Sequence, residues 1–147
     1  MLVNFLLGKR DLKGPDEIAN FIKNAPEFDP NTEHPEKSGA LLLFRTSQQQ
    51  TWLIATSERL YCILDDVREP KPQIKWVMQK SELVSSGDLI VPISVSEHSR
   101  NSGRLDIGTH KNWLFSKALF TATPVEEAVA TLIRKQMTDA QARAYAV

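Results

Sequence analysis

The side chains in this sequence that are best suited to bind a ligand are four cations in its last third. They are Arg100, Arg104, Lys111 and Lys117, with His98 and His110 among them. Between His98 and Lys117 the one acidic residue is Asp106, so we expect this end of the domain to be locally positive. Because grouped cations bind phosphates and anionic head groups, the four cations are a candidate anionic-ligand or lipid face. The commoner alternative is a set of solvated loop and strand side chains.

Residues that often carry catalysis or bind metals are scattered. His34, His98 and His110 show no His-x-x-x-His spacing, and each falls in a predicted loop. The single cysteine, Cys62, lies in an apolar run, which predicts a buried structural thiol. Asp65-Asp66 ends a predicted strand, where a turn that hydrogen-bonds its own backbone is favoured over a cation site. We therefore assign no catalytic residue, no metal and no cofactor.

Composition limits the classes of protein to consider. With 147 residues and 41% hydrophobic content, the chain is long enough for one ordinary core. Eighteen basic and eighteen acidic side chains balance, which argues against nucleic acid as a partner. One cysteine excludes an intrachain disulfide framework and is compatible with the reducing cytoplasm, where we expect the protein to be located.

Residues 1–37 are predicted to form an N-terminal arm. Its apolar opening, residues 1–7, is too short to span a bilayer and has the wrong order of charge for a secretory signal. Two uses remain open: packing on the domain or a second subunit, which we favour, or lying at a membrane surface through Leu2, Phe5 and Leu6. Gly14-Pro15 then begins a short helix with an apolar stripe of Ile18, Phe21 and Ile22, and an exposed connection follows over residues 27–37.

From Gly39 the sequence changes to short apolar and β-branched runs separated by polar turns, which predicts a mainly β domain. The expected strands are residues 40–46, 51–56, 60–65, 74–79, 89–96, 104–108 and 113–120. Pro92 within its run indicates an edge or a bulge. Candidates for inward-facing side chains in the last three strands are Ile90, Leu105, Ile107, Leu114 and Ala118. Trp52, Trp76 and Trp113 are expected to pack in the core or at its rim, with a nucleic-acid surface as the alternative that zero net charge disfavours.

One amphipathic helix closes the domain. Thr123 is predicted as its N-cap, Pro124 as its first helical residue, and Glu126 as the partner of Thr123 in a capping box. Apolar residues then recur at helical spacing up to Met137, so one face of the helix must be covered. Residues 138–147 form a C-terminal tail.

Seven strands in a four-plus-three grouping followed by one capped helix resemble the pleckstrin-homology-like (PH-like) barrel, including its bacterial and GRAM-type relatives. The segment Ala55-Thr56-Ser57-Glu58-Arg59-Leu60-Tyr61 is similar to the Thr-x-x-Arg-Leu-Tyr turn between two strands in many such domains. The resemblance covers residues 38–137 and implies a seven-stranded barrel capped by the C-terminal helix. The closing helix lacks the tryptophan usual in eukaryotic members, which points to the bacterial-type branch or to a different barrel.

The resemblance also bears on ligands. Phosphoinositide-binding members carry several lysines and arginines around the first hairpin, whereas here Ser47-Gln48-Gln49-Gln50 has only Arg45 beside it. A head-group site of that kind is therefore not expected.

These features lead to three functional hypotheses. The first is a non-enzymatic interaction module that binds a protein partner or associates with itself, because such barrels expose an edge strand and a groove near the closing helix. The second is a peripheral membrane module that binds anionic lipid through the arm and the four cations. The third, which we favour least, is an enzyme of unknown reaction built on loop residues such as His98 and His110.

Overall fold

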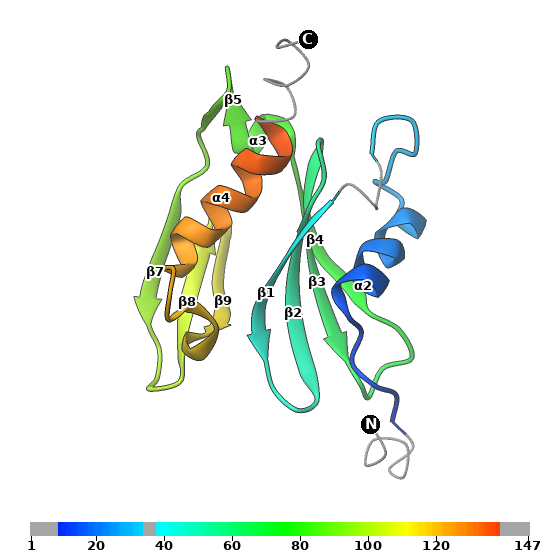
Figure 1. The fold of residues 1–147 in the computed structure, drawn as a ribbon, viewed down its shortest axis with the longest axis vertical. Helices are drawn as coiled ribbons and strands as arrows, with labels where there is room; N and C mark the ends of the chain where they lie inside the picture. The colour runs from blue at the N-terminus through cyan, green and yellow to red at the C-terminus, as the bar shows by residue number, and fades with distance from the viewer. Residues whose placement is uncertain (1–8, 34–37, 139–147) are drawn as a thin grey trace.

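The computed structural model describes residues 9–33 and 38–138, and its main feature is a pair of antiparallel sheets (Figure 1). The first sheet is a four-stranded meander in chain order: β1 (Gly39–Arg45), β2 (Gln49–Ala55), β3 (Arg59–Asp66) and β4 (Gln73–Gln79). The second sheet has three strands, β7 (Ile93–Glu97), β8 (Ser102–Ile107) and β9 (His110–Ser116). A two-stranded hairpin, β5 (Val84–Ser85) and β6 (Asp88–Leu89), connects them.

The helices lie at the two ends of the chain and at one connection. The N-terminal arm contains α2 (Pro15–Phe21), which continues into the 3-10 turn η1 (Ile22–Asn24). The short helix α3 (Lys80–Leu83) follows β4, and the 3-10 turn η3 (Lys117–Phe120) follows β9. The closing helix α4 spans Val125–Met137. Within the described residues, no helix has the length and apolar character needed to cross a bilayer.

The expected mainly β class with a closing helix is confirmed. The described strands form three separate sheets and do not join into one closed barrel, so the PH-like barrel stays a prediction. The expected strand at residues 89–96 is divided, because Pro92 separates β6 from β7 and lacks the backbone N–H that a strand interior uses. Pro92 therefore precedes an edge strand, as its position indicated.

The predicted bounds of the last strand, residues 113–120, are wrong at both ends. β9 begins at His110, inside the predicted loop, and ends at Ser116, after which Lys117–Phe120 turn as a 3-10 helix. Asn112 has a positive φ of 63° where the register between β8 and β9 shifts, so the pairing runs through an irregularity that alternation alone does not reveal. Of the proposed inward side chains, Leu105 and Ile107 are buried, whereas Ile90 and Ala118 are exposed and Leu114 lies outside the core cluster.

The start of α4 also differs from the prediction. Pro124 is the N-cap residue, with φ −55° and ψ 143°, Val125 is the first helical residue, and no side chain caps the helix. The Pro124 carbonyl accepts hydrogen bonds from the amides of Glu127 and Ala128 at 3.1 and 3.0 Å. The expected capping box of Thr123 and Glu126 is therefore absent, because the helix starts one residue later and moves Thr123 outside it.

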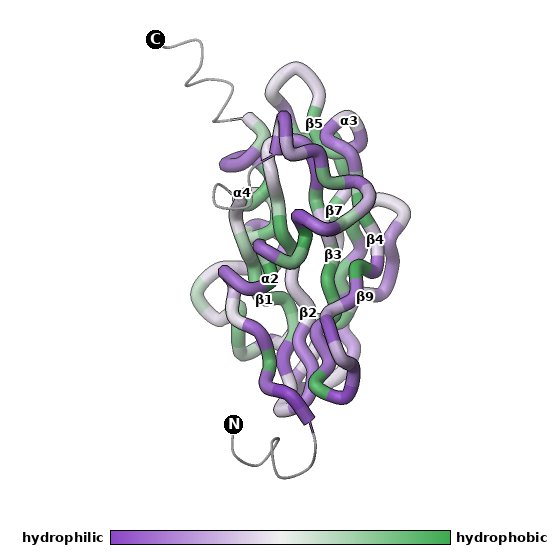
Figure 2. The backbone as a smooth tube through the Cα atoms, turned by 90° about the vertical axis from the view of Figure 1, so that its right-hand side faces the viewer, coloured by the Kyte–Doolittle hydropathy of each residue, from purple (hydrophilic) through white to green (hydrophobic). Residues whose placement is uncertain are grey.

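The main core fills the space between the two sheets and α4. Its fully buried members include Leu53, Leu60, Leu105, Ile107 and Ile133, which come from both sheets and from the closing helix. In Figure 2 the hydrophobic colour follows the strands, and the turns are mostly hydrophilic. Burying this surface is the principal stabilisation expected for a domain of this size.

A second apolar cluster lies on the opposite face of the four-stranded sheet, beneath the arm. Ile18 and Ile22 pack there against Trp52, Ile54 and Ile63, and all five are buried. Figure 1 shows α2 on the side of this sheet that faces away from α4. The helix and its apolar stripe are confirmed where predicted, and the sheet is covered on both faces as a result.

Candidate functional site

The four candidate cations do not gather into one site. β8 runs from Ser102 to Ile107, so Arg100 precedes the strand and Lys111 follows the next turn, at opposite ends of the sheet. Arg104 lies midway along β8 on the face away from the core, because its neighbours Gly103 and Leu105 are the buried residues. Lys117 forms an ion pair with Glu97. The Lys117 amide donates to the Asn101 carbonyl at 2.9 Å, so Lys117 lies at the same end of the sheet as Arg100, whereas Lys111 lies at the other end.

The arm residues of the membrane hypothesis, Leu2, Phe5 and Leu6, lie outside the described residues. The part of the arm that is described, from Lys9 onward, docks against the four-stranded sheet of the same chain.

A hollow lies where the closing helix begins, which we call the α4 hollow. It has a volume of about 240 Å³, and the residues around it are Glu97, Phe115, Lys117, Phe120, Pro124, Val125 and Glu126. The rings of Phe115 and Phe120 meet edge to face, with centroids 5.9 Å apart and planes at 83°. The phenylalanines and Val125 supply apolar surface, while Glu97, Glu126 and Lys117 supply charge. Such a lining suits a side chain with an apolar body.

Beside this hollow, β7 is an open edge of the three-stranded sheet. The amide of Gly108 donates to the Pro92 carbonyl at 2.9 Å, which makes Pro92 and Gly108 a hydrogen-bonded pair of the β7–β8 ladder. Because such pairs alternate in an antiparallel ladder, the backbone groups of Ser94 and Ser96 face β8. Those of Ile93, Val95 and Glu97, which we call the β7 edge, face away from it and have no hydrogen-bond partner in the described parts of the chain.

The side chains of the β7 edge point towards the core face of the sheet. Ile93 pairs with Ile107, and Val95 pairs with Leu105, and both partners are fully buried. Val95 nevertheless keeps 43% of its surface exposed. An inward-facing apolar side chain with this exposure indicates that the core face is incompletely covered along β7.

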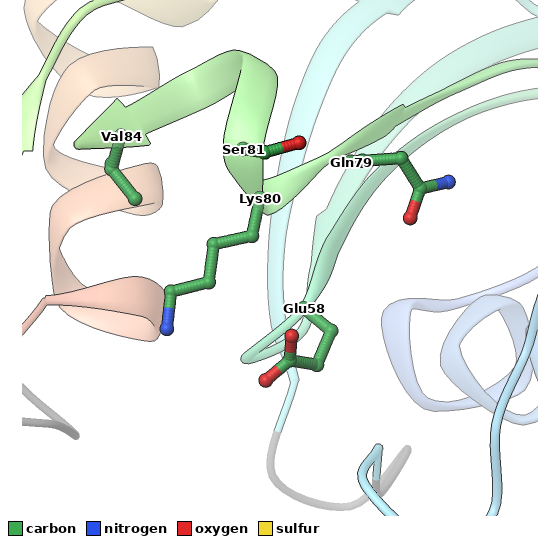
Figure 3. A pocket seen from close by; sticks show the side chains of 5 residues that line it. All are labelled: Glu58, Gln79, Lys80, Ser81 and Val84. Carbon is green, nitrogen blue, oxygen red and sulfur yellow. The ribbon is translucent and has the colours of Figure 1, made fainter.

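A larger hollow of about 390 Å³ lies under α3, and Figure 3 shows its lining. Its residues are Glu58, Gln79, Lys80, Ser81 and Val84. The Gln79 amide points away from the side on which Lys80 and Glu58 extend (Figure 3). Four of the five lining residues are polar, and Val84 is the one buried residue among them. The backbone amide of Lys80 donates to the Glu58 carbonyl at 2.8 Å, which joins the start of α3 to the turn before β3.

The Thr-x-x-Arg-Leu-Tyr segment converges on one buried acid of the arm, Glu33, which is 1% exposed. The Thr56 hydroxyl donates to Glu33 Oε1, Arg59 Nη1 lies 2.5 Å from Oε2, and the Tyr61 hydroxyl donates to Oε1 at 3.0 Å. Burial, together with the charge of Glu33 and the hydrogen bond to it, raises the pKa of the Tyr61 hydroxyl. Tyr61 therefore remains a protonated donor, and these residues, the Glu33 cluster, join the arm to the start of β3.

A second polar attachment joins the arm to the end of β3. Asp65 is fully buried, and its carboxylate lies 2.5 Å from Arg10 Nη2 and accepts the Lys13 amide at 2.6 Å. The Gln50 side-chain amide also donates to Asp65, at 3.0 Å. The prediction of a self-contained turn is wrong for Asp65, because this carboxylate binds the arm.

For Asp66 the turn prediction is confirmed. Its Oδ1 accepts the backbone amide of Arg68, two residues on, at 2.9 Å. The Arg68 side chain lies 2.6 Å from Oδ2. The hydrogen bond from the Arg68 side chain lowers the pKa of the Asp66 carboxyl.

The remaining residues considered for catalysis or metal binding are Cys62, His98 and His110. Cys62 is buried, and burial raises the pKa of its thiol. His110, predicted in a loop, lies in β9 and stacks on Trp76 with centroids 4.3 Å apart. His98 is exposed after β7. In residues 9–33 and 38–138 no three potential metal-ligating side chains lie together.

Sequence reasoning missed the Glu33 cluster and the α4 hollow. Glu33 is one acid in a polar stretch of 27–37, and nothing in its neighbourhood indicates burial. The α4 hollow combines residues from β7, β9, η3 and α4, which only the fold brings together. Compared with protein families, curated proteins and solved structures, the chain matches none of them.

Proposed function

We propose that this chain is a non-enzymatic interaction module with a PH-like fold, which binds an extended protein segment along the β7 edge. The observation that carries the proposal is the open row of backbone groups at Ile93, Val95 and Glu97 next to the α4 hollow. An added strand would satisfy these groups, and its alternate side chains would face the exposed side of Val95 and the hollow.

The PH-like part of the proposal is supported by the way β9 crosses the first sheet. At the end of β9 the Ser116 hydroxyl accepts the amide of Arg45, in β1, at 3.0 Å. At its beginning His110 stacks on Trp76, in β4. β9 thus extends from one edge strand of the four-stranded sheet to the other, and α4 covers the remaining opening of the core. Two sheets crossing in this way, followed by a helix, are the arrangement that the family resemblance implies.

The chemistry of the β7 edge favours a strand as ligand. β7 contains no lysine and no proline, and its register with β8 has no bulge. Proteins usually protect an exposed edge with charged side chains, lysine above all, with proline or with bulges. The one charged residue of β7, Glu97, is the last residue of the strand and forms an ion pair with Lys117. Ser94 and Ser96, on the outer face, are small and leave the approach to the backbone open.

The proposal is tested by substituting Val95 with proline. The Val95 amide faces away from β8, so proline removes a donor from the open edge and leaves the ladder to β8 intact. Tagged full-length protein and the Val95→Pro variant are purified from native cells, and the retained proteins are identified by mass spectrometry. We expect a partner that wild type and Val95→Thr retain and Val95→Pro loses.

Hydrogen exchange on the recovered complex supplies the structural readout. The amides of Val95 and Glu97 should exchange more slowly in the complex than in the free protein, because they become ladder donors. Identical partner sets for wild type and Val95→Pro, with unchanged exchange at these amides, would refute binding at the β7 edge.

A further inference from the structure

We infer that the segment bound at the β7 edge is β7 of a second copy of this chain, paired antiparallel about a two-fold axis at Val95. This inference rests on the proposed function and names the partner. The two three-stranded sheets would then form one continuous six-stranded sheet, with α4 of both copies on the same side.

The β7 residues whose backbone groups face away from β8 are spaced so that this pairing can form. When a strand pairs antiparallel with a second copy of itself about a central residue, that residue lies opposite the same residue of the other copy. The residue two positions before it lies opposite the residue two positions after it in the other copy. Centred on Val95, the pairs are Val95 with Val95 and Ile93 with Glu97, which are the three residues with free backbone groups. All would be hydrogen-bonded pairs, and together they would supply about six new backbone hydrogen bonds.

The side chains on both faces of β7 suit a copy of the same strand. On the core face, the exposed surface of Val95 would contact that of its counterpart, and β-branched pairs stabilise neighbouring strands. On the outer face, Ser94 would lie opposite Ser96 of the other copy, and both hydroxyls can donate and accept. The arrangement places no like charges directly opposite each other.

The α4 hollow has a place in this pairing. Glu97 lines the hollow and would lie opposite Ile93 of the other copy. That isoleucine would lie at the edge of the hollow next to Glu97, with Glu97 and Gly103 between it and Phe115 in the order of the strands. An aliphatic side chain would thereby cover part of Glu97, whose side chain is 86% exposed in the single chain.

A cysteine introduced at position 95 tests the pairing directly. Residues of a hydrogen-bonded antiparallel pair have Cα atoms about 5.5 Å apart, and this separation lies within the range that disulfides span. The Val95→Cys variant should therefore form a covalent dimer under mild oxidation. Thr131→Cys, on the exposed face of α4, is the matched control and should remain monomeric. The native Cys62 is buried and should not contribute.

Analytical ultracentrifugation of the full chain supplies the second measurement. Wild type should show a monomer–dimer equilibrium, and Val95→Pro should weaken the dimer at least tenfold. Ser94→Pro serves as a fold control, because the Ser94 amide faces β8 and its loss should destabilise the monomer itself.

The outcomes separate this inference from the proposed function. A monomeric wild type, together with a Val95→Cys variant that forms no disulfide, would overturn the two-fold pairing and leave binding of another protein to be judged by the purification experiment. A dimer that persists in Val95→Pro would overturn it as well, since another surface would be responsible. A dimer that is lost in Val95→Pro but is not cross-linked in Val95→Cys would refute pairing about Val95. It would still support the β7 edge as the interface of the dimer. Removing residues 1–8 would then test that segment of a second copy as the added strand.

Discussion

The hydroxyl of Tyr61 donates a hydrogen bond to the carboxylate of Glu33, with Tyr61 Oη 3.0 Å from Glu33 Oε1, although the two residues are 28 positions apart. Tyr61 belongs to β3, and Glu33 belongs to the arm. The bond lies beside the ion pair of Glu33 with Arg59, and both residues of the tyrosine bond are buried. The turn that suggested a family resemblance therefore serves in this chain to fix the arm to the sheet.

Replacing Glu33 by glutamine should destabilise the protein by about 2 to 3 kcal/mol, because Arg59 loses its carboxylate partner in a largely buried setting. The expected effect is below the full cost for a buried pair, since the Arg59 side chain is 21% exposed. Urea unfolding measures the change, and Glu27→Gln, at an exposed position of the same segment, is the control. Equal stability of the two variants would mean that the Glu33 cluster does not stabilise the arm.

The stability of the protein should fall on acidification partly because of Asp66. The pKa of this carboxyl is lower in the folded protein than in the unfolded chain, owing to the hydrogen bond from Arg68. Its contribution is therefore complete above the unfolded pKa of about 4 and is lost as the pH falls below that value. In Asp66→Asn the free energy of unfolding should decline less between about pH 4 and pH 2.

The control for this pH dependence is Asp88→Asn, at an exposed position in β6. This variant should keep the wild-type slope. If Asp66→Asn also kept it, the ion pair with Arg68 would make no contribution in solution.

Cys62 should react with a thiol reagent only when the domain unfolds. The side chain is 0% exposed, and burial raises the pKa of the thiol, so both access and the thiolate population are low in the native state. The labelling rate with an aromatic disulfide should increase with urea in parallel with the unfolded fraction. Rapid labelling in buffer alone would show that β3 opens locally.

Substituting Gly103 by alanine should destabilise the protein by about 1 to 3 kcal/mol, since the methyl group would overpack the core. A Cβ at this position would lie 2.5 Å from Cε1 of Phe115 and closer still to its Cζ. The ring would have to leave its place at the α4 hollow.

A double-mutant comparison checks the cause of this effect. Leucine at position 115 lacks the outer ring atoms, so Gly103→Ala should cost less in a Phe115→Leu background than in wild type. Equal costs in the two backgrounds would exclude the contact with Phe115 as the reason.

The sequence by itself determined the local elements. Pro15 with Ile18 and Ile22 predicted α2 and its buried stripe, and the apolar period up to Met137 predicted α4. Alternation in β8 identified Leu105 and Ile107 as core residues. These predictions succeed because they depend on neighbours within a turn or a strand, where the spacing of apolar residues reflects the face that is buried.

Strand ends and faces were less predictable, for a physical reason visible in β2 and β3. Leu53 and Cys62 face the main core, while Trp52 and Ile63 face the arm, so both faces of these strands are apolar and alternation disappears. The start of β9 at His110 was missed because its stacking partner, Trp76, belongs to another sheet.

Only the tertiary structure decided which polar residues act together. Glu33 and Asp65 are ordinary acids in sequence, and they become buried attachment points because the arm folds back over β3. Arg100 and Lys111, close in sequence, are separated because β8 places them at opposite ends of the sheet, whereas β9 returns Lys117 to the end where Arg100 lies. The β7 edge likewise follows from the order of strands in space, since a strand is an edge only when nothing pairs with its second side.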